Sequence, residues 1–408
     1  MSRSQIVDIT GLGAEGDGAA MTAAGKPIFI PLALPGERWR IAEGRPPELI
    51  TPHPERRVPP CRHFGACGGC VAQHMPAEMY RTWKRDFLVR ALKQHGVDAE
   101  IQPLVMVAER SRRRATFTAR RESGRMRIGY HGRRSHDFVA IEACPVLDDR
   151  IVVLLAALAA LAEVVAPRSE AVRVAITMTD SGADVDVEGH EKTLSAMARA
   201  RIGEIAAASR LARVSVGGVP VIERQAPVLH FAGMAVTLPP GAFLQAVPEA
   251  ERTMIELVTA ALGKAREVAD LFCGLGTLTL PIARKARVLA FDGNRNAIAA
   301  LNEAQRKNQG LKPFTARARD LFRDPLSPLE MKDLDAVVLD PPRAGARAQC
   351  ERLALSKVKR VVMVSCSPAT LARDCRILID GGYRLEALTP IDQFLYAPHL
   401  EAVAVLLR

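Results

Sequence analysis

Glu267-Val-Ala-Asp-Leu-Phe-Cys-Gly-Leu-Gly-Thr-Leu-Thr-Leu280 is the stretch that decides the fold of this chain. An apolar run, a turn with two glycines and a second apolar run predict a strand, a tight turn and a helix. About twenty residues after the turn, Val288-Leu-Ala-Phe-Asp292 predicts a second strand whose terminal acid is placed to bind a ribose. The same spacing fits nicotinamide-dependent enzymes, so the glycines alone leave the ligand open.

Strands and helices alternate on both sides of this unit. A helix is expected over 248–262, and Asp320 closes a third strand-like segment. Ala336-Val-Val-Leu-Asp340 predicts a buried strand whose polar end is made rigid by two prolines. Val361-Val-Met-Val-Ser-Cys366 predicts another, which carries a thiol to the edge of the sheet. This pattern predicts a doubly wound parallel sheet that binds its ligands at the carboxyl ends of the strands.

Length and composition describe an ordinary globular protein. The chain has 408 residues, of which 48% are hydrophobic and 25% charged, so we expect two to three domains. The longest apolar run, 151–165, contains Glu163 and is too short to cross a bilayer. The start, Met1-Ser-Arg-Ser-Gln5, lacks the apolar core of a signal peptide. We therefore expect a cytoplasmic protein without a membrane partner, whose cysteines are ligands or catalytic groups rather than disulfides.

Positive charge is concentrated in one segment. The net charge is +11, and residues 110–134 contain ten arginines, no lysine and one acid, Glu122, which gives that segment +9. Arginine at this density favours a phosphate backbone as partner, so we expect RNA or DNA binding. Aromatic residues make up only 4% of the chain, and the nucleic acid is therefore expected to be held mainly by charge.

The first part of the chain predicts a small β-barrel followed by a metal site. Short apolar runs around a glycine-rich turn at 11–18 predict the barrel, and proline-rich sequence after it predicts a linker. Three cysteines then fall within ten residues and a fourth stands far downstream: Cys61, Cys67, Cys70 and Cys144. This spacing suits an iron–sulfur cluster better than structural zinc, for which His63 and His74 are alternative ligands.

Several motifs together resemble a known family. Residues 7–18 and 29–37 look like the TRAM domain, and the cysteine spacing is similar to the [4Fe-4S] site of the RlmD-like enzymes. The remaining motifs resemble, in order, those of the RNA 5-methyluridine methyltransferases: Phe243-Leu-Gln245, Asp270-Leu-Phe-Cys-Gly-Leu-Gly276, Asp340-Pro-Pro-Arg-Ala-Gly345, Ser365-Cys-Ser-Pro368 and His399-Leu-Glu401.

The resemblance implies an α/β fold in three parts. We expect a TRAM-like barrel of the oligonucleotide-binding type at 1–56 and a β-rich central domain at 57–240 that carries the cluster cysteines and the arginines. A class I, Rossmann-like methyltransferase domain dependent on S-adenosyl-L-methionine is expected at 241–408.

The resemblance also implies the reaction and its residues. Cys366 is expected to add to C6 of a uracil, so that C5 becomes nucleophilic and takes the methyl group, and Glu401 is expected to remove the C5 proton. Asp340 is expected to contact the uracil or the cofactor. The expected S-adenosyl-L-methionine site is lined by Gln245, Phe272, Thr277, Asp292, Asp320 and Asp340.

Some features depart from the family or leave alternatives open. The family usually has proline and threonine where this chain has Leu395 and Ala397, close to Glu401. The expected substrate is 23S ribosomal RNA, with transfer RNA as the alternative. An RNA cytosine-5 methyltransferase is a second alternative, although such enzymes commonly carry a cysteine near Asp-Pro-Pro, where this chain has Arg343. We expect a monomer with no obligate protein partner.

Overall fold

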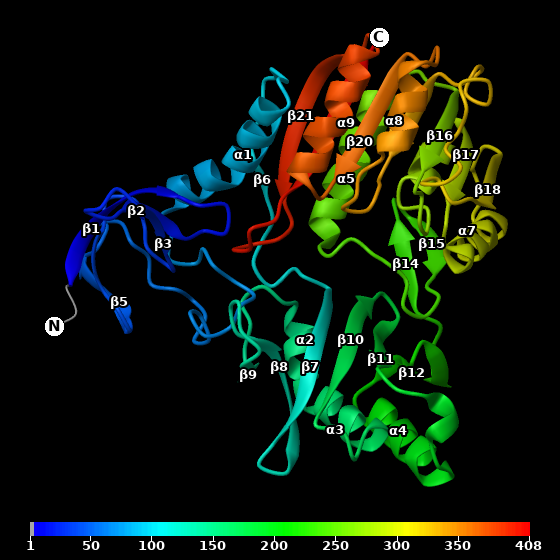
Figure 1. Ribbon diagram of the computed structural model, residues 1–408. Coiled ribbons are helices and arrows are strands. Elements are labelled where there is room, and N and C mark those ends of the chain that lie inside the picture. The colour runs from blue at the N-terminus through cyan, green and yellow to red at the C-terminus, as the bar shows by residue number, and fades with distance from the viewer. Residues whose placement is uncertain (1–3) are drawn as a thin grey trace.

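The computed structural model describes residues 4–408 and shows the chain in three sheet-centred parts (Figure 1). The first part is a five-stranded antiparallel sheet in the order β3-β2-β1-β4-β5. Gly18 is required there, because a Cβ at this position would lie 2.7 Å from the Cβ of Ala33. The strands are β1 (Gln5–Leu12), β2 (Gly18–Met21), β3 (Pro27–Ile30), β4 (Arg38–Ala42) and β5 (Arg45–Thr51).

The second part is a seven-stranded sheet in the order β13-β12-β11-β10-β7-β8-β9, packed against α3 and α4 (Figure 1). The apolar run at 151–165 is divided at Leu154 between two helices. The elements are β7 (Arg114–Glu122), β8 (Arg125–His131), β9 (Phe138–Ala140), α2 (Asp149–Val153), α3 (Leu155–Val165), β10 (Ala171–Thr179), β11 (Gly182–Val187), η1 (Glu191–Thr193), α4 (Ala196–Ala208), β12 (Leu211–Val216) and β13 (Val219–Glu223).

The third part is an eight-stranded sheet in the order β18-β17-β16-β19-β20-β22-β21-β6. The first five strands are parallel, and β22 lies antiparallel between β20 and β21. The strands are β6 (Val105–Met106), β16 (Glu267–Leu271), β17 (Arg287–Asp292), β18 (Phe314–Ala318), β19 (Ala336–Leu339), β20 (Arg360–Ser365), β21 (Arg384–Asp392) and β22 (Glu401–Leu407). The predicted mixed α/β fold with a largely parallel sheet is confirmed.

Helices cover both faces of this sheet. One hydrophobic core lies between the sheet and α5, α6 and α7, and a second lies between the sheet and α1, α8 and α9. The helices are α1 (Ala77–Gln94), α5 (Pro248–Leu262), α6 (Thr279–Ala283), α7 (Arg295–Lys307), α8 (Arg347–Ala354) and α9 (Pro368–Asp380). A hairpin of β14 (Val228–Phe231) and β15 (Met234–Thr237) packs on α7.

Besides the β14–β15 hairpin, two elements from the range 57–240 belong to the third part by their packing. Helix α1 packs on α9, and β6 pairs in parallel with β21 (Figure 1). The chain thus enters the C-terminal sheet, leaves it for the central sheet and returns. The domain boundaries at 56 and 240 therefore stay a prediction, and residues 1–3 of the first range lie outside the described residues.

The arginine-rich segment has a larger structural role than a solvated basic surface would have. Six of its ten arginines form ion pairs within the chain. Arg113 is buried and donates to Glu251 at 2.6 Å, and Arg133 and Arg134 both contact Asp17 of the first sheet. Part of this charge therefore holds the three parts together. Across residues 4–408, no helix combines the length and the apolar character needed to cross a membrane.

Candidate active site

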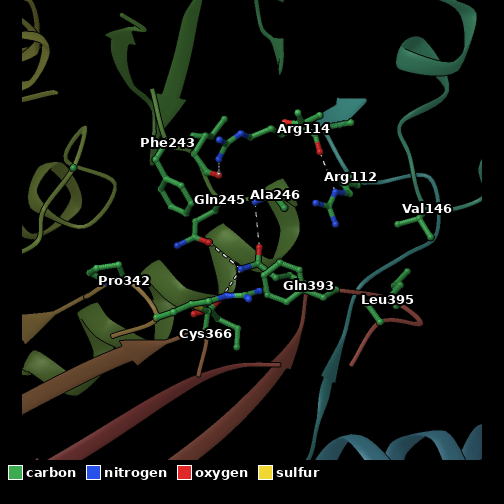
Figure 2. A pocket seen from close by; sticks show the side chains of 18 of the residues that line it. Arg112, Arg114, Val146, Phe243, Gln245, Ala246, Pro342, Cys366, Gln393 and Leu395 are labelled. Carbon is green, nitrogen blue, oxygen red and sulfur yellow. Dashed lines mark hydrogen bonds between the residues drawn. The ribbon is translucent and has the colours of Figure 1, made fainter. Parts of the chain in front are cut away.

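A cavity of about 870 Å³ lies between the C-terminal sheet and the central sheet (Figure 2). Its walls include the ends of β16, β17, β19 and β20 on one side and residues next to β7 on the other. Every residue predicted for the catalytic, cofactor and metal sites lines it: Cys61, Cys67, Cys70, Cys144, Gln245, Phe272, Thr277, Asp292, Asp320, Asp340, Cys366 and Glu401. The fold thus brings together positions that lie up to 340 residues apart, Cys61 and Glu401.

The glycine turn after β16 forms one end of the cavity. The backbone N–H of Gly274 donates to Asp292 Oδ2 at 2.9 Å, which joins the turn to the end of β17. Gly276 has a φ of 87°, and a Cβ on it would lie 2.4 Å from Leu301 Cδ1 on α7. Only glycine therefore lets the turn approach this helix, and Asp292 is held at the cavity wall where a ribose acceptor was predicted.

Asp270 is a buried carboxyl at the same end. Its Oδ2 accepts a hydrogen bond from Thr279 Oγ1 at 2.5 Å, whereas its Oδ1 has no partner among the described residues. Burial raises the pKa of Asp270 to about 7. A buried acceptor without a donor is costly, so this oxygen is suited to a ligand that donates.

An aromatic pair completes this end of the cavity. Asp320 Oδ1 accepts from the backbone N–H of Phe322 at 3.1 Å, and the Phe322 ring centroid lies 5.4 Å from that of Phe272. Phe322 is 49% exposed and lines the cavity. Sequence reasoning missed Phe322, because an aromatic residue two positions after an acid carries no motif of its own.

Cys366 lies between the end of β20 and the first turn of α9 (Figure 2). The Ser367 side chain caps α9 by accepting from the backbone N–H of Thr370, and Pro368 begins the helix. Burial raises the pKa of the Cys366 thiol, and Glu401 and Asp340 raise it further, whereas Arg343 lowers it. The Arg343 guanidinium and the N-terminus of α9 are the two features that favour a thiolate at Cys366.

Glu401 begins β22 and is only 2% exposed. Burial raises the pKa of its carboxyl to about 7, and a hydrogen bond from Gln393 opposes this effect. Asp340 lies nearby at the end of β19, and burial raises the pKa of its carboxyl well above the ordinary value. A carboxyl that titrates near neutral pH is suited to proton transfer.

Amide side chains connect these carboxyl groups (Figure 2). Gln393 Nε2 donates to Glu401 Oε2 at 2.6 Å and to Gln245 Oε1 at 2.9 Å. Gln245 Nε2 in turn donates to Asp340 Oδ2 at 3.4 Å. Sequence reasoning missed Gln393, although it stands beside Asp392 in the motif that leads to Glu401.

A buried ion pair holds the loop between β21 and β22. Lys84 on α1 is fully buried and donates to Asp392 Oδ1 at 2.6 Å, to the Phe394 carbonyl at 2.9 Å and to the His399 carbonyl at 2.7 Å. The Tyr80 hydroxyl donates to the other oxygen of Asp392. The loop that leads to Glu401 is therefore held at both ends.

The departures from the family pattern fall within this loop. Leu395 is only 5% exposed, packs in the hydrophobic core and lines the cavity. The loop is thus filled by an aliphatic side chain where the family usually has proline.

Sequence reasoning missed Lys84 as an anchor of this loop, since a lysine inside the apolar stripe of a helix usually extends to solvent.

The four predicted metal-binding cysteines lie along one side of the same cavity. Burial raises the pKa of Cys67, Cys144 and Cys70, the last to about 12. The loop that carries Cys61, Cys67 and Cys70 is tied to the end of β8, where Gly68 N–H donates to the His131 carbonyl at 3.0 Å. Among residues 4–408, however, no group of three or more His, Cys, Asp or Glu side chains is arranged to hold a metal ion.

Comparisons with known proteins identify the family. The tRNA (Uracil-5-)-methyltransferase family matches residues 226–408. An uncharacterized RNA methyltransferase of Brucella suis is 46% identical and covers 100% of this chain, with 99% of its own length aligned. The 23S rRNA (uracil(1939)-C(5))-methyltransferase RlmD of Yersinia enterocolitica is 31% identical over 94% of this chain and 91% of its own length.

A solved structure shares the whole fold. The Pyrococcus abyssi tRNA (uracil-54, C5)-methyltransferase, solved in complex with S-adenosyl-L-homocysteine, has a TM-score of 0.74 and covers 100% of both chains at 22% identity. The matches at 31% and 46% identity extend over almost the full chain, including the segments that build the cavity. The chain belongs to the RNA uracil-5-methyltransferase family.

Proposed function

We propose that this protein forms 5-methyluridine in 23S ribosomal RNA, with Cys366 as nucleophile and Glu401 as base. One observation carries the proposal: the half-buried thiol of Cys366 and the buried carboxyl of Glu401 line one cavity, which also extends to the glycine turn after β16. A base that enters between them would meet a nucleophile, a proton acceptor and a methyl donor at one place.

The chemistry follows from the two side chains. Once its proton has passed to solvent, Cys366 Sγ bonds to C6 of the uracil, and the electrons of the C5–C6 double bond move toward C4 and O4, which makes C5 nucleophilic. S-adenosyl-L-methionine, when bound, supplies the methyl group that C5 takes. Glu401 then accepts the C5 proton, the C5–C6 double bond forms again, and the C6–Sγ bond breaks to return the thiolate.

The end of the cavity at the glycine turn after β16 fits S-adenosyl-L-methionine. The unpartnered Asp270 Oδ1 offers an acceptor to the donors of the cofactor, and Asp292 offers a second acceptor for its ribose. Phe272 and Phe322 supply an apolar wall beside Asp320. Gln245, Thr277 and Asp340 extend this wall toward Cys366.

The cysteine side of the cavity fits a [4Fe-4S] cluster by its donor set. All four thiols line this cavity, and soft thiolate ligands are those that iron–sulfur clusters use. We infer that Cys61, Cys67, Cys70 and Cys144 hold such a cluster.

The RNA would be held by the central and N-terminal parts. Arg112 and Arg114 line the cavity, and Arg114 lies over the ring of Phe243, which is 68% exposed. The Yersinia relative supports ribosomal RNA as the substrate. We propose 1–56 as a TRAM-like barrel, 57–240 as the cluster and RNA-binding domain, and 241–408 as the methyltransferase domain.

Product mapping tests the substrate and the reaction together. The purified protein is incubated with S-adenosyl-L-methionine and either 23S ribosomal RNA or transfer RNA from a strain that lacks the enzyme, and the modified nucleosides are identified by mass spectrometry. We expect 5-methyluridine in 23S RNA. Methylation of transfer RNA only, or formation of 5-methylcytidine, would contradict the proposal.

A matched pair of variants tests the nucleophile. Cys366→Ala is expected to abolish methyl transfer, whereas Cys375→Ala, which removes a thiol buried in α9 away from the cavity, is expected to retain it. Normal turnover by Cys366→Ala would refute covalent catalysis.

A further inference from the structure

Gln393 occupies a central position among the buried polar groups of the cavity. Its side chain is 1% exposed and forms three hydrogen bonds with groups that flank the reaction site. Two of them, to Glu401 and Gln245, come from Nε2, and the third is accepted by Oε1 from the backbone N–H of Ala246 at 3.2 Å (Figure 2). Gln393 thus connects two strand ends with the segment before α5.

The backbone contact determines which way the amide points. An N–H group can only donate, so the atom of Gln393 that faces Ala246 N must be the oxygen, and the NH₂ group must face Glu401 and Gln245. Gln245 then presents its own oxygen to Gln393 and its NH₂ group to Asp340. A single backbone N–H therefore sets the direction of the whole chain of hydrogen bonds.

This arrangement has a consequence for the two oxygens of Glu401. Gln393 binds Oε2 at 2.6 Å, and a hydrogen bond of this kind restrains the carboxylate while it leaves Oε1 available. We propose that Gln393 is a positioning residue, which fixes Glu401 with one oxygen free to take the C5 proton and favours its ionised form. The inference rests on the proposed function of Glu401 as the base.

Other titratable and charged groups lie around the same carboxyl. Arg343 lowers the pKa of Glu401 and so favours its ionised form. The Glu401 carboxylate in turn raises the pKa of Asp340, at the end of β19, and of the Cys366 thiol, between β20 and α9. His399, two residues before Glu401, lies with its Nε2 3.5 Å from Arg343 Nη2. Gln393 is the neutral donor in this set, so its replacement changes no formal charge in the cavity.

The test compares Gln393→Met with Gln349→Met. Methionine matches glutamine in length but cannot form these hydrogen bonds. Gln349 is also 1% exposed and hydrogen bonds to the backbone of Leu326, and it does not line the cavity. It therefore controls for the loss of a buried amide as such.

Single-turnover reactions with RNA that carries tritium at uridine C5 measure two events. Transfer of the methyl group is followed with ¹⁴C-labelled S-adenosyl-L-methionine, and removal of the C5 proton is followed as tritium released to water. For Gln393→Met we expect tritium release to slow about tenfold at pH 6.5, with a much smaller change in methyl transfer. A protein–RNA adduct that survives denaturing electrophoresis should accumulate.

The pH profile separates positioning from a merely structural role. Without the donor from Gln393, the pH at which tritium release is half-maximal should rise by about one unit, so that much of the deficit disappears near pH 9. Equal slowing of both events at every pH, or the same behaviour in Gln349→Met, would overturn the inference. Glu401→Gln distinguishes failure of this inference from failure of the proposed function. If that variant does not accumulate the adduct either, Glu401 is not the base.

Discussion

Replacement of Lys84 by methionine should destabilise the protein far more than the loss of a surface lysine. Lys84 and Asp392 are both fully buried, and their atoms lie 2.6 Å apart. The substitution leaves the Asp392 carboxylate with only the Tyr80 hydroxyl, and it removes the donor for two backbone carbonyls of the loop. Breaking one partner of a buried pair costs about 3–5 kcal/mol, because the remaining charge is left uncompensated.

Urea unfolding measures this cost, with tryptophan fluorescence as the signal. The chain has two tryptophans, and Trp83 is buried beside Lys84 on α1. We expect Lys84→Met to lower the free energy of unfolding by about 3–5 kcal/mol. The double variant Lys84→Met/Asp392→Asn should recover a large part of this loss, since it removes the unpaired charge but keeps an acceptor for Tyr80.

Lys307→Met provides the matched control. Lys307 pairs with Glu303 at 2.5 Å, but both side chains are about half exposed. Exposed pairs contribute little to stability because water and salt screen the two charges, so this variant should unfold almost as the parent does. If Lys84→Met also lost less than about 1 kcal/mol, the view that this pair anchors the loop between β21 and β22 would be wrong.

Three further outcomes are expected at other positions. Glu401→Gln should accumulate the methylated RNA adduct in denaturing gels. As the pH rises from 4.5 past 7, this variant should also become more stable than the parent by up to about 3 kcal/mol, because ionisation of the parent's buried carboxyl, with a pKa of about 7, opposes folding over that range. Equal stability of the two proteins at pH 8.5 would contradict this prediction. Cys70→Ser should lose the visible absorbance of protein purified without oxygen, and a colourless parent that contains zinc would refute the cluster. Gly276→Ala should weaken calorimetric binding of S-adenosyl-L-methionine by at least about tenfold, since the new Cβ would overlap Leu301 and the residue has a φ of 87°; unchanged affinity would show that the turn does not contact the cofactor.

Local sequence patterns were sufficient for the elements that carry the motifs. The apolar run before Cys366 forms β20 as predicted, and Ser367 and Pro368 begin α9. The glycine turn after β16 and the acid at the end of β17 also lie where the spacing placed them. Such features follow from the nearest neighbours in the chain, because strand periodicity, capping and glycine conformations are local properties.

The arginine segment shows where local reasoning fell short. Its charge favoured a nucleic-acid surface, yet Arg113 is buried against Glu251, which lies 138 residues away. A charge run does not reveal which of its members meet an acid elsewhere in the chain. Helix α1 is a similar case, because its packing partner α9 lies far away in the chain.

The sequence by itself determined the reaction class, because Cys366, Asp340 and Glu401 stand in motifs whose chemistry depends on residue type and order along a parallel sheet. Only the tertiary structure decided how Glu401 is held. Gln393 and Lys84 act on it through hydrogen bonds that join α1, the segment before α5 and the loop between β21 and β22. The physical reason is that the orientation of a buried amide and the partner of a buried lysine depend on groups distant in sequence, and folding alone brings those groups within hydrogen-bond distance.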